Sequence, residues 1–108
     1  MEEFDDQLLK RLRIALDEDG RKDQRICKDA NIGPNYIRGI YNEGKKPSVE
    51  YLMKILDELG QSATIYVLTG MRLTNLDIEF LNLIPNMSER SKRHALALFQ
   101  EMRDGEDA

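Results

Sequence analysis

The chain has 108 residues, of which 41% are hydrophobic and 33% charged, and its formal net charge is −4. This length predicts one domain with a terminal extension, and the acidic balance argues against blanket affinity for nucleic acid. The acidic beginning is unlike a signal peptide, no apolar run reaches the ~18 residues of a membrane span, and the single cysteine leaves no internal disulfide. We therefore expect a cytoplasmic protein without a membrane segment.

Five stretches between residues 7 and 69 carry apolar side chains at helical spacing, and none shows the alternation of a half-buried strand. The expected helices follow apolar stripes at residues 8–16, 26–30, 37–40, 49–59 and 63–68. Turn-forming residues separate the stripes, as is typical of short helices with tight connections around one core. The pattern predicts an all-α fold.

Prolines and serines mark where several of these helices begin. Pro34 fits the first position of the third helix, where its missing N–H costs nothing. Pro47 keeps the chain extended before Ser48, which is a good N-cap for the fourth helix. Ser62 is the expected N-cap of the fifth helix, and Gly70 follows its last turn.

Residues 71–108 form a separate stretch with two further expected helices. Thr74 opens an apolar run that continues to Ile84, where a proline breaks it, and Ser88 caps the last helix. Residues 103–108 are expected to form a frayed acidic tail. The apolar residues of this stretch either pack on the preceding helices or form a dimer interface, and we favour the dimer.

Positive charge is concentrated in one part of this acidic chain. Between residues 21 and 46 the sequence has seven basic and three acidic residues. The basic residues are Arg21, Lys22, Arg25, Lys28, Arg38, Lys45 and Lys46. A local basic patch attracts a polyanion even when the whole chain is acidic.

A set of spaced positions between Arg11 and Gly60 forms one pattern without a gap: Leu12, Gly20, Ile26, Cys27, Ala30, Ile32, Ile37, Ile40, Pro47, Ser48, Leu59 and Gly60. In these residues and their spacing the sequence resembles the phage-repressor and Cro-type (XRE-like) helix-turn-helix family. The next segment, QSATIYVLTG, resembles the family's fifth helix. The resemblance implies an all-α, five-helix repressor-like DNA-binding domain at residues 1–70. A short C-terminal helical extension at residues 71–108 would then be a possible dimerisation element.

The resemblance also implies a function, which is sequence-specific DNA binding by a transcriptional regulator of the repressor type. Its recognition helix would span about residues 34–42 and lie in the major groove. The outward-facing residues would be Asn35, Arg38, Gly39 and Asn42. Asn35 either bonds adenine or caps the helix, and Arg38 either contacts guanine or phosphate or is simply solvated. The implied partners are double-stranded DNA and a second copy of the chain, with no cofactor.

Contacts with the DNA backbone are expected after this helix. Lys45 and Lys46, in the following loop, either bind phosphate or are only solvated. Tyr36 either stacks on a sugar, bonds a phosphate, or packs against the protein.

The start of the second helix departs from the family pattern. The family usually has Gln at its first position, whereas this chain has Asp23, which suits a helix N-terminus but is unfavourable near phosphate. Gln24 could serve one residue later, and Lys22 and Arg25 could hold the opposite backbone.

A second class of function is a protein-interaction module of the same fold, such as an antitoxin or an adaptor. The acidic net charge and the unusual residues Gly33, Pro34 and Gly39 favour it. An enzyme is not expected, because the sequence has no nucleophile–base pair, paired carboxylates, phosphate-binding glycine loop or metal cluster. His94, the only histidine, is no metal site by itself, and Cys27 is expected to fill the core, with a redox sensor as the alternative.

Overall fold

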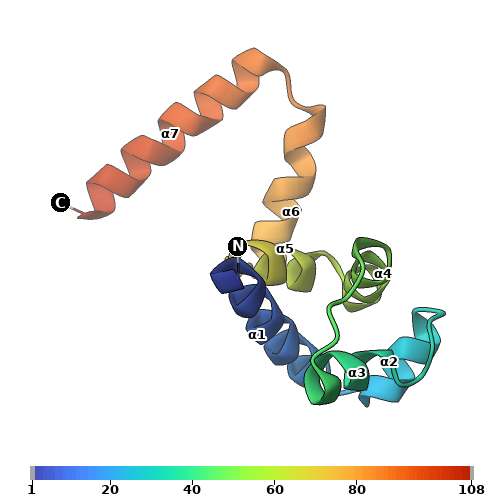
Figure 1. Ribbon diagram of the computed structural model, residues 1–108. Helices are drawn as coiled ribbons and strands as arrows, with labels where there is room; N and C mark the ends of the chain where they lie inside the picture. The colour runs from blue at the N-terminus through green and yellow to red at the C-terminus, as the bar shows by residue number, and fades with distance from the viewer. Residues whose placement is uncertain (1, 108) are drawn as a thin grey trace. The chain divides into compact units, whose positions relative to one another are not determined.

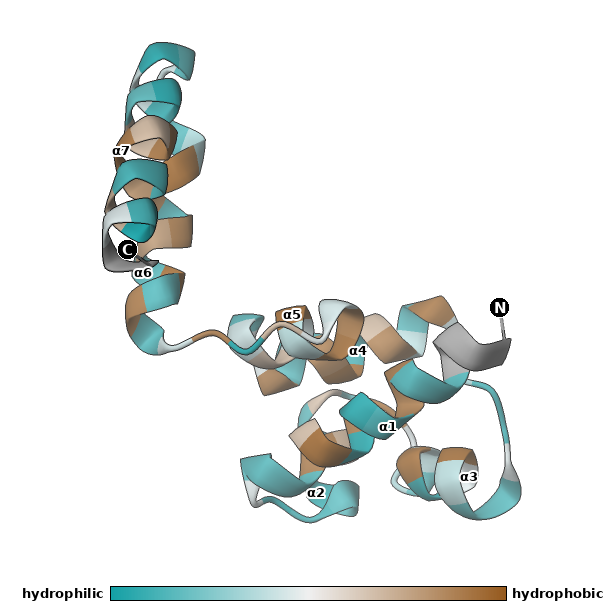
Figure 2. Ribbon diagram, turned by 90° about the vertical axis from the view of Figure 1, so that its left-hand side faces the viewer, coloured by the Kyte–Doolittle hydropathy of each residue, from teal (hydrophilic) through white to brown (hydrophobic). Residues whose placement is uncertain are grey.

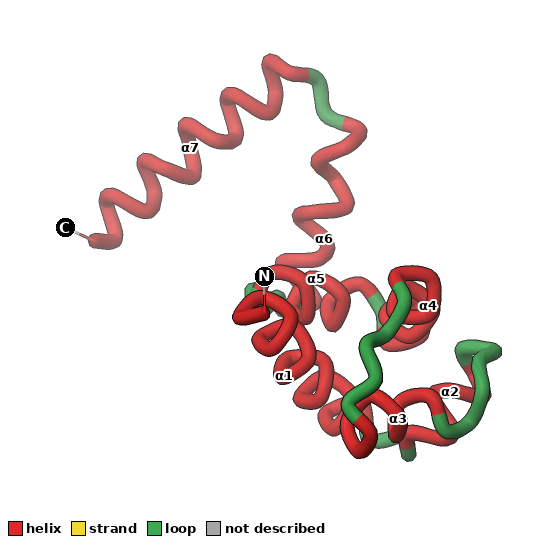
Figure 3. Tube along the Cα trace, in the orientation of Figure 1, coloured by secondary structure: helices red, strands yellow, loops and turns green. Residues whose placement is uncertain are grey.

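The computed structural model describes residues 2–107, with side chains described between residues 6 and 105. It is all-helical (Figure 1), and no strand occurs in this part of the chain (Figure 3). The all-α prediction is therefore confirmed. The helices are α1 (Glu2–Asp19), α2 (Asp23–Asp29), α3 (Tyr36–Glu43), α4 (Val49–Leu59), α5 (Gln61–Thr69), α6 (Asn75–Leu83) and α7 (Glu89–Asp107), with a 3-10 turn η1 (Ile84–Asn86) after α6.

The chain divides into two compact units, Met1–Thr74 and Asn75–Ala108. The boundary lies later than the expected division after residue 70, because the segment that follows α5 is held to the first unit. Arg72 pairs with Glu18 at 2.9 Å, and its guanidinium lies 3.8 Å from the ring centroid of Tyr66.

Of the predicted N-caps Ser48 and Ser62, the first is confirmed and the second is wrong. The Ser48 hydroxyl accepts a hydrogen bond from the Tyr51 N–H at 3.2 Å, which confirms it as the cap of α4. Ser62 does not cap α5, which already begins at Gln61. Its hydroxyl instead donates to the Leu73 carbonyl at 3.1 Å, so a tertiary contact uses the group that the local pattern assigned to capping.

The third helix begins two residues later than expected from the span 34–42. Tyr36 is its first residue, and the Tyr36 N–H donates to the Gly33 carbonyl at 3.1 Å, which is the shorter i to i−3 connection. Pro34 lies in this turn and not in the helix. Asn35 takes the N-cap position, but its side chain makes no capping hydrogen bond.

The core of the first unit is built from the apolar stripes of all five of its helices. In this unit, α1 packs on α4 and α5, α4 packs on α5, and α2 packs on both α3 and α4. The fully buried side chains are Leu12, Leu16, Ile26, Cys27, Ile37, Ile55, Leu56 and Val67. Cys27 therefore has the structural place that was expected for a small core residue.

The turn between α2 and α3 depends on one residue in a left-handed conformation. Asn31 has φ 60, a value that asparagine tolerates better than most residues because its side chain is short and polar. The chain then folds back, and the Ile32 N–H donates to the Cys27 carbonyl at 2.9 Å. This turn brings α3 back onto α2, with Ile37 in the core.

The second unit consists of α6, η1 and α7. The Ser88 hydroxyl accepts from the Ser91 N–H at 3.1 Å, so the predicted cap of the last helix is confirmed. The expected frayed tail at residues 103–108 is wrong as far as the structure describes it, because α7 continues to Asp107. A single exposed glycine, Gly105, costs a helix only about 1 kcal/mol, which is too little to end one of 19 residues.

Candidate nucleic-acid interface

Helix α3 has a buried face and an exposed face. Ile37 and Ile40 are buried and attach the helix to the first unit. Asn35, Arg38 and Asn42 are exposed, and their side chains make no hydrogen bond or ion pair with any residue that the structure describes. Amide and guanidinium groups can bond base edges or phosphates in this position. The exposed face of α3 thus offers donors and acceptors that the fold itself does not use.

Gly39 was expected on this exposed face, and that expectation is wrong. Gly39 is buried, and a Cβ there would lie 3.4 Å from Cδ of Lys45 and 3.6 Å from a carboxylate oxygen of Glu43. The reason is the end of α3, where Gly44 has φ 69 and turns the chain back. The Lys45 N–H then donates to the Gly39 carbonyl at 3.2 Å, so the lysine stem covers Gly39 against close approach.

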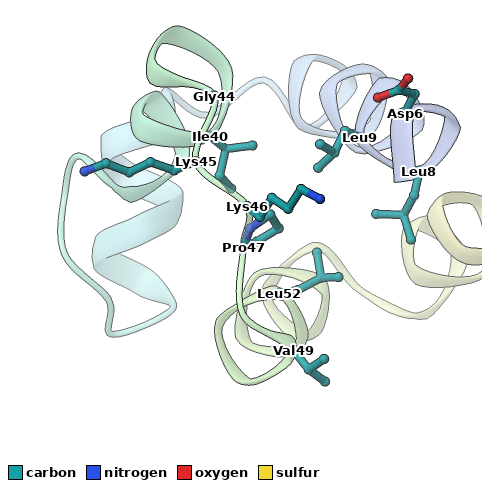
Figure 4. Close-up of a pocket in the computed structure, with 10 residues that line it drawn as sticks. All are labelled: Asp6, Leu8, Leu9, Ile40, Gly44, Lys45, Lys46, Pro47, Val49 and Leu52. Carbon is teal, nitrogen blue, oxygen red and sulfur yellow. The ribbon is translucent and has the colours of Figure 1, made fainter. Parts of the chain in front are cut away.

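The two lysines after α3 leave the loop in opposite directions (Figure 4). Lys45 extends along α3, and its ammonium lies 3.1 Å from the carboxylate of Glu43. Lys46 extends toward α1 in the same view and pairs with no carboxylate in the part of the chain that the structure describes. The two charges therefore do not form one patch, and Lys46 is the one without a partner.

Beside this loop lies an open groove of about 590 Å³ between α1, α3 and the start of α4 (Figure 4). Its lining includes the apolar side chains of Leu9, Ile40, Pro47, Val49 and Leu52. Val49 is 77% exposed. The groove could therefore receive an apolar side chain of a binding partner, next to the positive charge of Lys46 in the adjoining loop.

The first turn of α2 carries three of the predicted contact residues. Lys22 takes the N-cap position without a side-chain capping bond, and both Lys22 and Gln24 are exposed. Neither side chain pairs with another residue between positions 6 and 105. Arg25 is exposed too, but it pairs with Asp29 one turn later at 3.1 Å. Lys22 and Gln24 can therefore bind a ligand directly, whereas Arg25 would first have to break its ion pair with Asp29.

Asp23 is neutralised within the fold. Arg13, from α1, donates two hydrogen bonds to the two carboxylate oxygens of Asp23 at 2.8 and 2.9 Å. Arg13 also pairs with Asp17 at 2.8 Å, and its guanidinium lies 5.0 Å from the ring centroid of Tyr41 on α3. The hydrogen bonds with Asp23 raise the pKa of Arg13 above its ordinary value, so the arginine keeps its charge. The acid at this position therefore repels a polyanion less than its sequence suggests.

Arg21 was counted with the basic patch, but its charge serves the fold. Its guanidinium contacts the carboxylates of Asp19 at 2.7 Å and Glu58 at 2.6 Å. A third carboxylate, that of Asp29, lies at 3.0 Å. The hydrogen bond from Arg21 lowers the pKa of Asp19, which keeps that acid ionised. Arg21 therefore connects α2 to α1 and α4 and adds no free positive charge.

Two tyrosines hold α3 and the following loop in place. The Tyr36 hydroxyl accepts a hydrogen bond from the Ser48 N–H at 3.0 Å, and its ring lies edge-on to that of Tyr51 with centroids 4.9 Å apart. The Tyr41 hydroxyl donates to the Leu9 carbonyl at 2.7 Å. Burial raises the pKa of Tyr41 to about 12. Of the alternatives for Tyr36, packing against the protein is the one that its contacts describe.

Sequence reasoning missed the role of Arg13 in positioning the candidate site. Its pairing with Asp17, four residues on, was visible as a local helix contact. Its partner Asp23 lies on another helix, and the hydrogen bonds that connect α1 to α2 appear only in the folded structure.

Three further results bear on the function of the chain. No helix between residues 2 and 107 has both the length and the apolar character needed to cross a bilayer. Among the side chains described, those of residues 6–105, no three His, Cys, Asp or Glu gather as they would around a metal ion. Comparisons with models of protein families, with curated proteins and with solved structures gave no match to this chain.

Proposed function

We propose that the protein is a sequence-specific DNA-binding transcriptional regulator of the repressor type. In this proposal α2 and α3 form a helix-turn-helix, and α3 lies in the major groove of DNA. The observation that carries it is the exposed face of α3, where Asn35, Arg38 and Asn42 have no partner among the residues described, above an apolar anchor of Ile37 and Ile40. A helix whose apolar face is buried, and whose exposed polar side chains have no partner among the residues described, is suited to bind a polar ligand.

The free side chains have distinct roles in this proposal. Asn35 and Arg38 read base edges, because an amide fits adenine and a guanidinium fits guanine. Lys22 and Gln24 contact the backbone from the first turn of α2, and Lys46 contacts it from the loop. Each base contact is worth about 1–3 kcal/mol of discrimination against a wrong base, whereas phosphate contacts contribute affinity without sequence preference.

The test is selection of bound sequences from a random pool of duplex DNA, followed by affinity measurements on the selected duplex and on a scrambled one. We expect a defined motif. Arg38→Ala should weaken binding to the selected duplex by about 1–3 kcal/mol and leave the scrambled duplex less affected. Lys46→Ala should weaken both alike. Arg90→Ala is a matched control, because Arg90 is also exposed and unpaired in the described structure but belongs to α7.

Two results would contradict this assignment. One is a selection that yields no enriched motif. The other is an equal, sequence-independent loss in Arg38→Ala and Lys46→Ala, because the proposed division between base reading and phosphate contact requires them to differ.

A second candidate function is a protein-interaction module of the antitoxin or adaptor kind. Two observations favour it: carboxylates within the fold engage Arg21, Arg25 and Lys45, and an apolar groove lies beside the loop after α3. A gel-shift experiment with random duplex DNA at low and at moderate salt separates the two candidates. Binding at low salt that weakens as salt rises supports the DNA-binding function, and no shift at either salt supports the interaction module.

A further inference from the structure

The end of α3 carries an acidic residue that pairs with a lysine of the following loop. Along this helix, hydrophobic residues are interspersed with hydrophilic ones (Figure 2), and Glu43 is its last residue. The ammonium of Lys45, two residues later, lies 3.1 Å from the Glu43 carboxylate. An acid in the last turn of a helix opposes the helix dipole, so the local structure of α3 does not explain Glu43. Its contact with Lys45 is the role that the structure gives it.

The backbone, and not the ion pair alone, fixes the direction of Lys45. Gly44 ends α3 with φ 69, and the Gly39 carbonyl accepts hydrogen bonds from the N–H groups of both Gly44 and Lys45. These bonds turn the chain back, and the Lys45 side chain extends along α3 (Figure 4). The side chains of Lys45 and Glu43 are 73% and 60% exposed, and such a pair contributes little by itself. The turn therefore keeps the lysine beside the glutamate although water surrounds both.

Gly39 provides the space in which the stem of Lys45 lies. A Cβ at this position would lie 3.4 Å from Cδ of Lys45 and 3.6 Å from a carboxylate oxygen of Glu43. Glycine weakens the interior of a helix relative to alanine, and Gly39 is not among the glycines with positive φ, so the backbone does not require it there. The reason that the structure offers is the lysine stem that packs over it.

We propose that Glu43 competes with DNA phosphate for Lys45 and thereby limits the affinity of the chain for duplex DNA. This inference rests on the proposed function, in which α3 lies in the major groove and the loop after it runs beside the DNA backbone. In the free chain Glu43 holds Lys45, whereas the neighbouring Lys46 pairs with no carboxylate in the described structure. Lys46 is then the phosphate contact of this loop, and Lys45 is a second one that Glu43 withholds.

The consequence is a weaker attraction to DNA of any sequence. Phosphate contacts add affinity without sequence preference, and they supply most of the binding to non-specific DNA. A carboxylate that removes one cation from this set lowers the affinity for every sequence alike. The contacts of Asn35 and Arg38 with base edges are not affected, so recognition depends more on α3 than on charge.

The test is the salt dependence of binding to the selected duplex and to the scrambled one, measured for the full chain and for Glu43→Gln. This change removes the charge and keeps the size of the side chain. The binding constant falls with salt concentration by a power of about 0.9 for each phosphate that a protein neutralises. We expect Glu43→Gln to steepen the power by about 0.9 on both duplexes. Its affinity should then fall about 3.5-fold further than that of the wild type between about 50 and about 200 mM salt.

Two further variants show whether the effect passes through Lys45. Lys45→Ala alone should leave the salt dependence of the wild type unchanged, because Glu43 already withholds this lysine from phosphate. Glu43→Gln combined with Lys45→Ala should return the salt dependence to the wild-type value.

Glu18→Gln is the matched control. Glu18 is 53% exposed, against 60% for Glu43, and pairs with Arg72 at 2.9 Å, so the change removes the same charge and one ion pair from the first unit. Arg72 still has its contact with Tyr66, whose ring centroid lies 3.8 Å from the guanidinium. The salt dependence of this variant should equal that of the wild type.

The outcomes separate this inference from the proposed function. Wild-type salt dependence in Glu43→Gln, a shallower dependence in Lys45→Ala alone, or a steepening that persists in the double variant would each overturn the inference while the DNA-binding function stands. Failure of both the wild type and Glu43→Gln to bind any duplex at about 50 mM salt, where phosphate contacts are strong, would overturn the DNA-binding function and this inference together.

Discussion

Replacing Arg13 by alanine should destabilise the first unit by about 2 kcal/mol, because this one side chain joins three helices. It lies on α1, binds Asp23 on α2 through two hydrogen bonds, and lies over the ring of Tyr41 on α3. Both contacts disappear together in Arg13→Ala, so the loss should exceed that of an ordinary surface change.

The magnitude follows from the exposure of the groups. The side chains of Arg13 and Asp23 are 32% and 34% exposed, so their pair is only partly screened by water. Charged hydrogen bonds in such a setting contribute about 1.5 kcal/mol, and the contact with Tyr41 adds about 0.5 kcal/mol. Asp17 is 65% exposed, and an exposed pair of this kind adds only a few tenths of a kcal/mol.

Urea unfolding followed by tyrosine fluorescence measures this loss. All four tyrosines, at positions 36, 41, 51 and 66, belong to the first unit, and the chain has no tryptophan, so the signal reports that unit alone. Arg103→Ala is the control, because Arg103 is 68% exposed and, among the described side chains, meets only Asp104, at 3.5 Å. It should change the free energy of unfolding by less than about 0.5 kcal/mol.

A double-mutant cycle with Asp23→Ala tests the cause of the loss. If the bidentate pair carries most of it, Arg13→Ala and Asp23→Ala should be coupled by about 1 kcal/mol or more. A loss below about 0.5 kcal/mol for Arg13→Ala, or additive losses in the cycle, would mean that the Arg13–Asp23 pair does not stabilise the first unit.

Two further predictions concern the unfolding of the same unit in urea. Ser48→Ala should lower the free energy of unfolding by about 1 kcal/mol, because it removes the acceptor for the Tyr51 N–H, and an unchanged urea midpoint would mean that this cap is not needed. Stability should also fall as pH rises from 10.0, the ordinary pKa of a tyrosine, toward about 12, the pKa of Tyr41 in the folded protein. In this range the unfolded chain loses the Tyr41 proton while the folded chain keeps it, so rising pH favours the unfolded state. Tyr41→Phe should flatten this fall, and an equally steep fall in that variant would exclude Tyr41 as its source.

The helices were predictable from the sequence because their signals are local. Apolar spacing and the caps Ser48 and Ser88 identify helices that form with their capping bonds in place. In two of the failures, a group outside the helix had changed the role of a residue. Ser62 bonds the Leu73 carbonyl instead of capping α5, and Gly39 is covered by the returning stem of Lys45. Local patterns contain no information about such contacts.

The candidate site was predictable only in part for the same reason. The exposed positions of Asn35, Arg38 and Asn42 follow from helix periodicity around the buried Ile37. The positive charge that remains available between residues 21 and 46 could not be predicted from the composition of that stretch. Arg21 counts as free in a sum over the sequence, but one of its carboxylate partners, Glu58, lies 37 residues away along the chain. Which basic residues remain available therefore depends on how α1, α2 and α4 pack together.

The proposed function requires that α3 and the first turn of α2 form the surface that contacts DNA. An NMR titration of the full chain with a selected duplex tests it most directly, because backbone amide shifts locate the contact surface residue by residue. We expect the largest shifts at residues 22–25 and 35–46, with smaller shifts elsewhere in the first unit. Shifts confined to residues 75–107, or no shifts with duplex in excess, would contradict it.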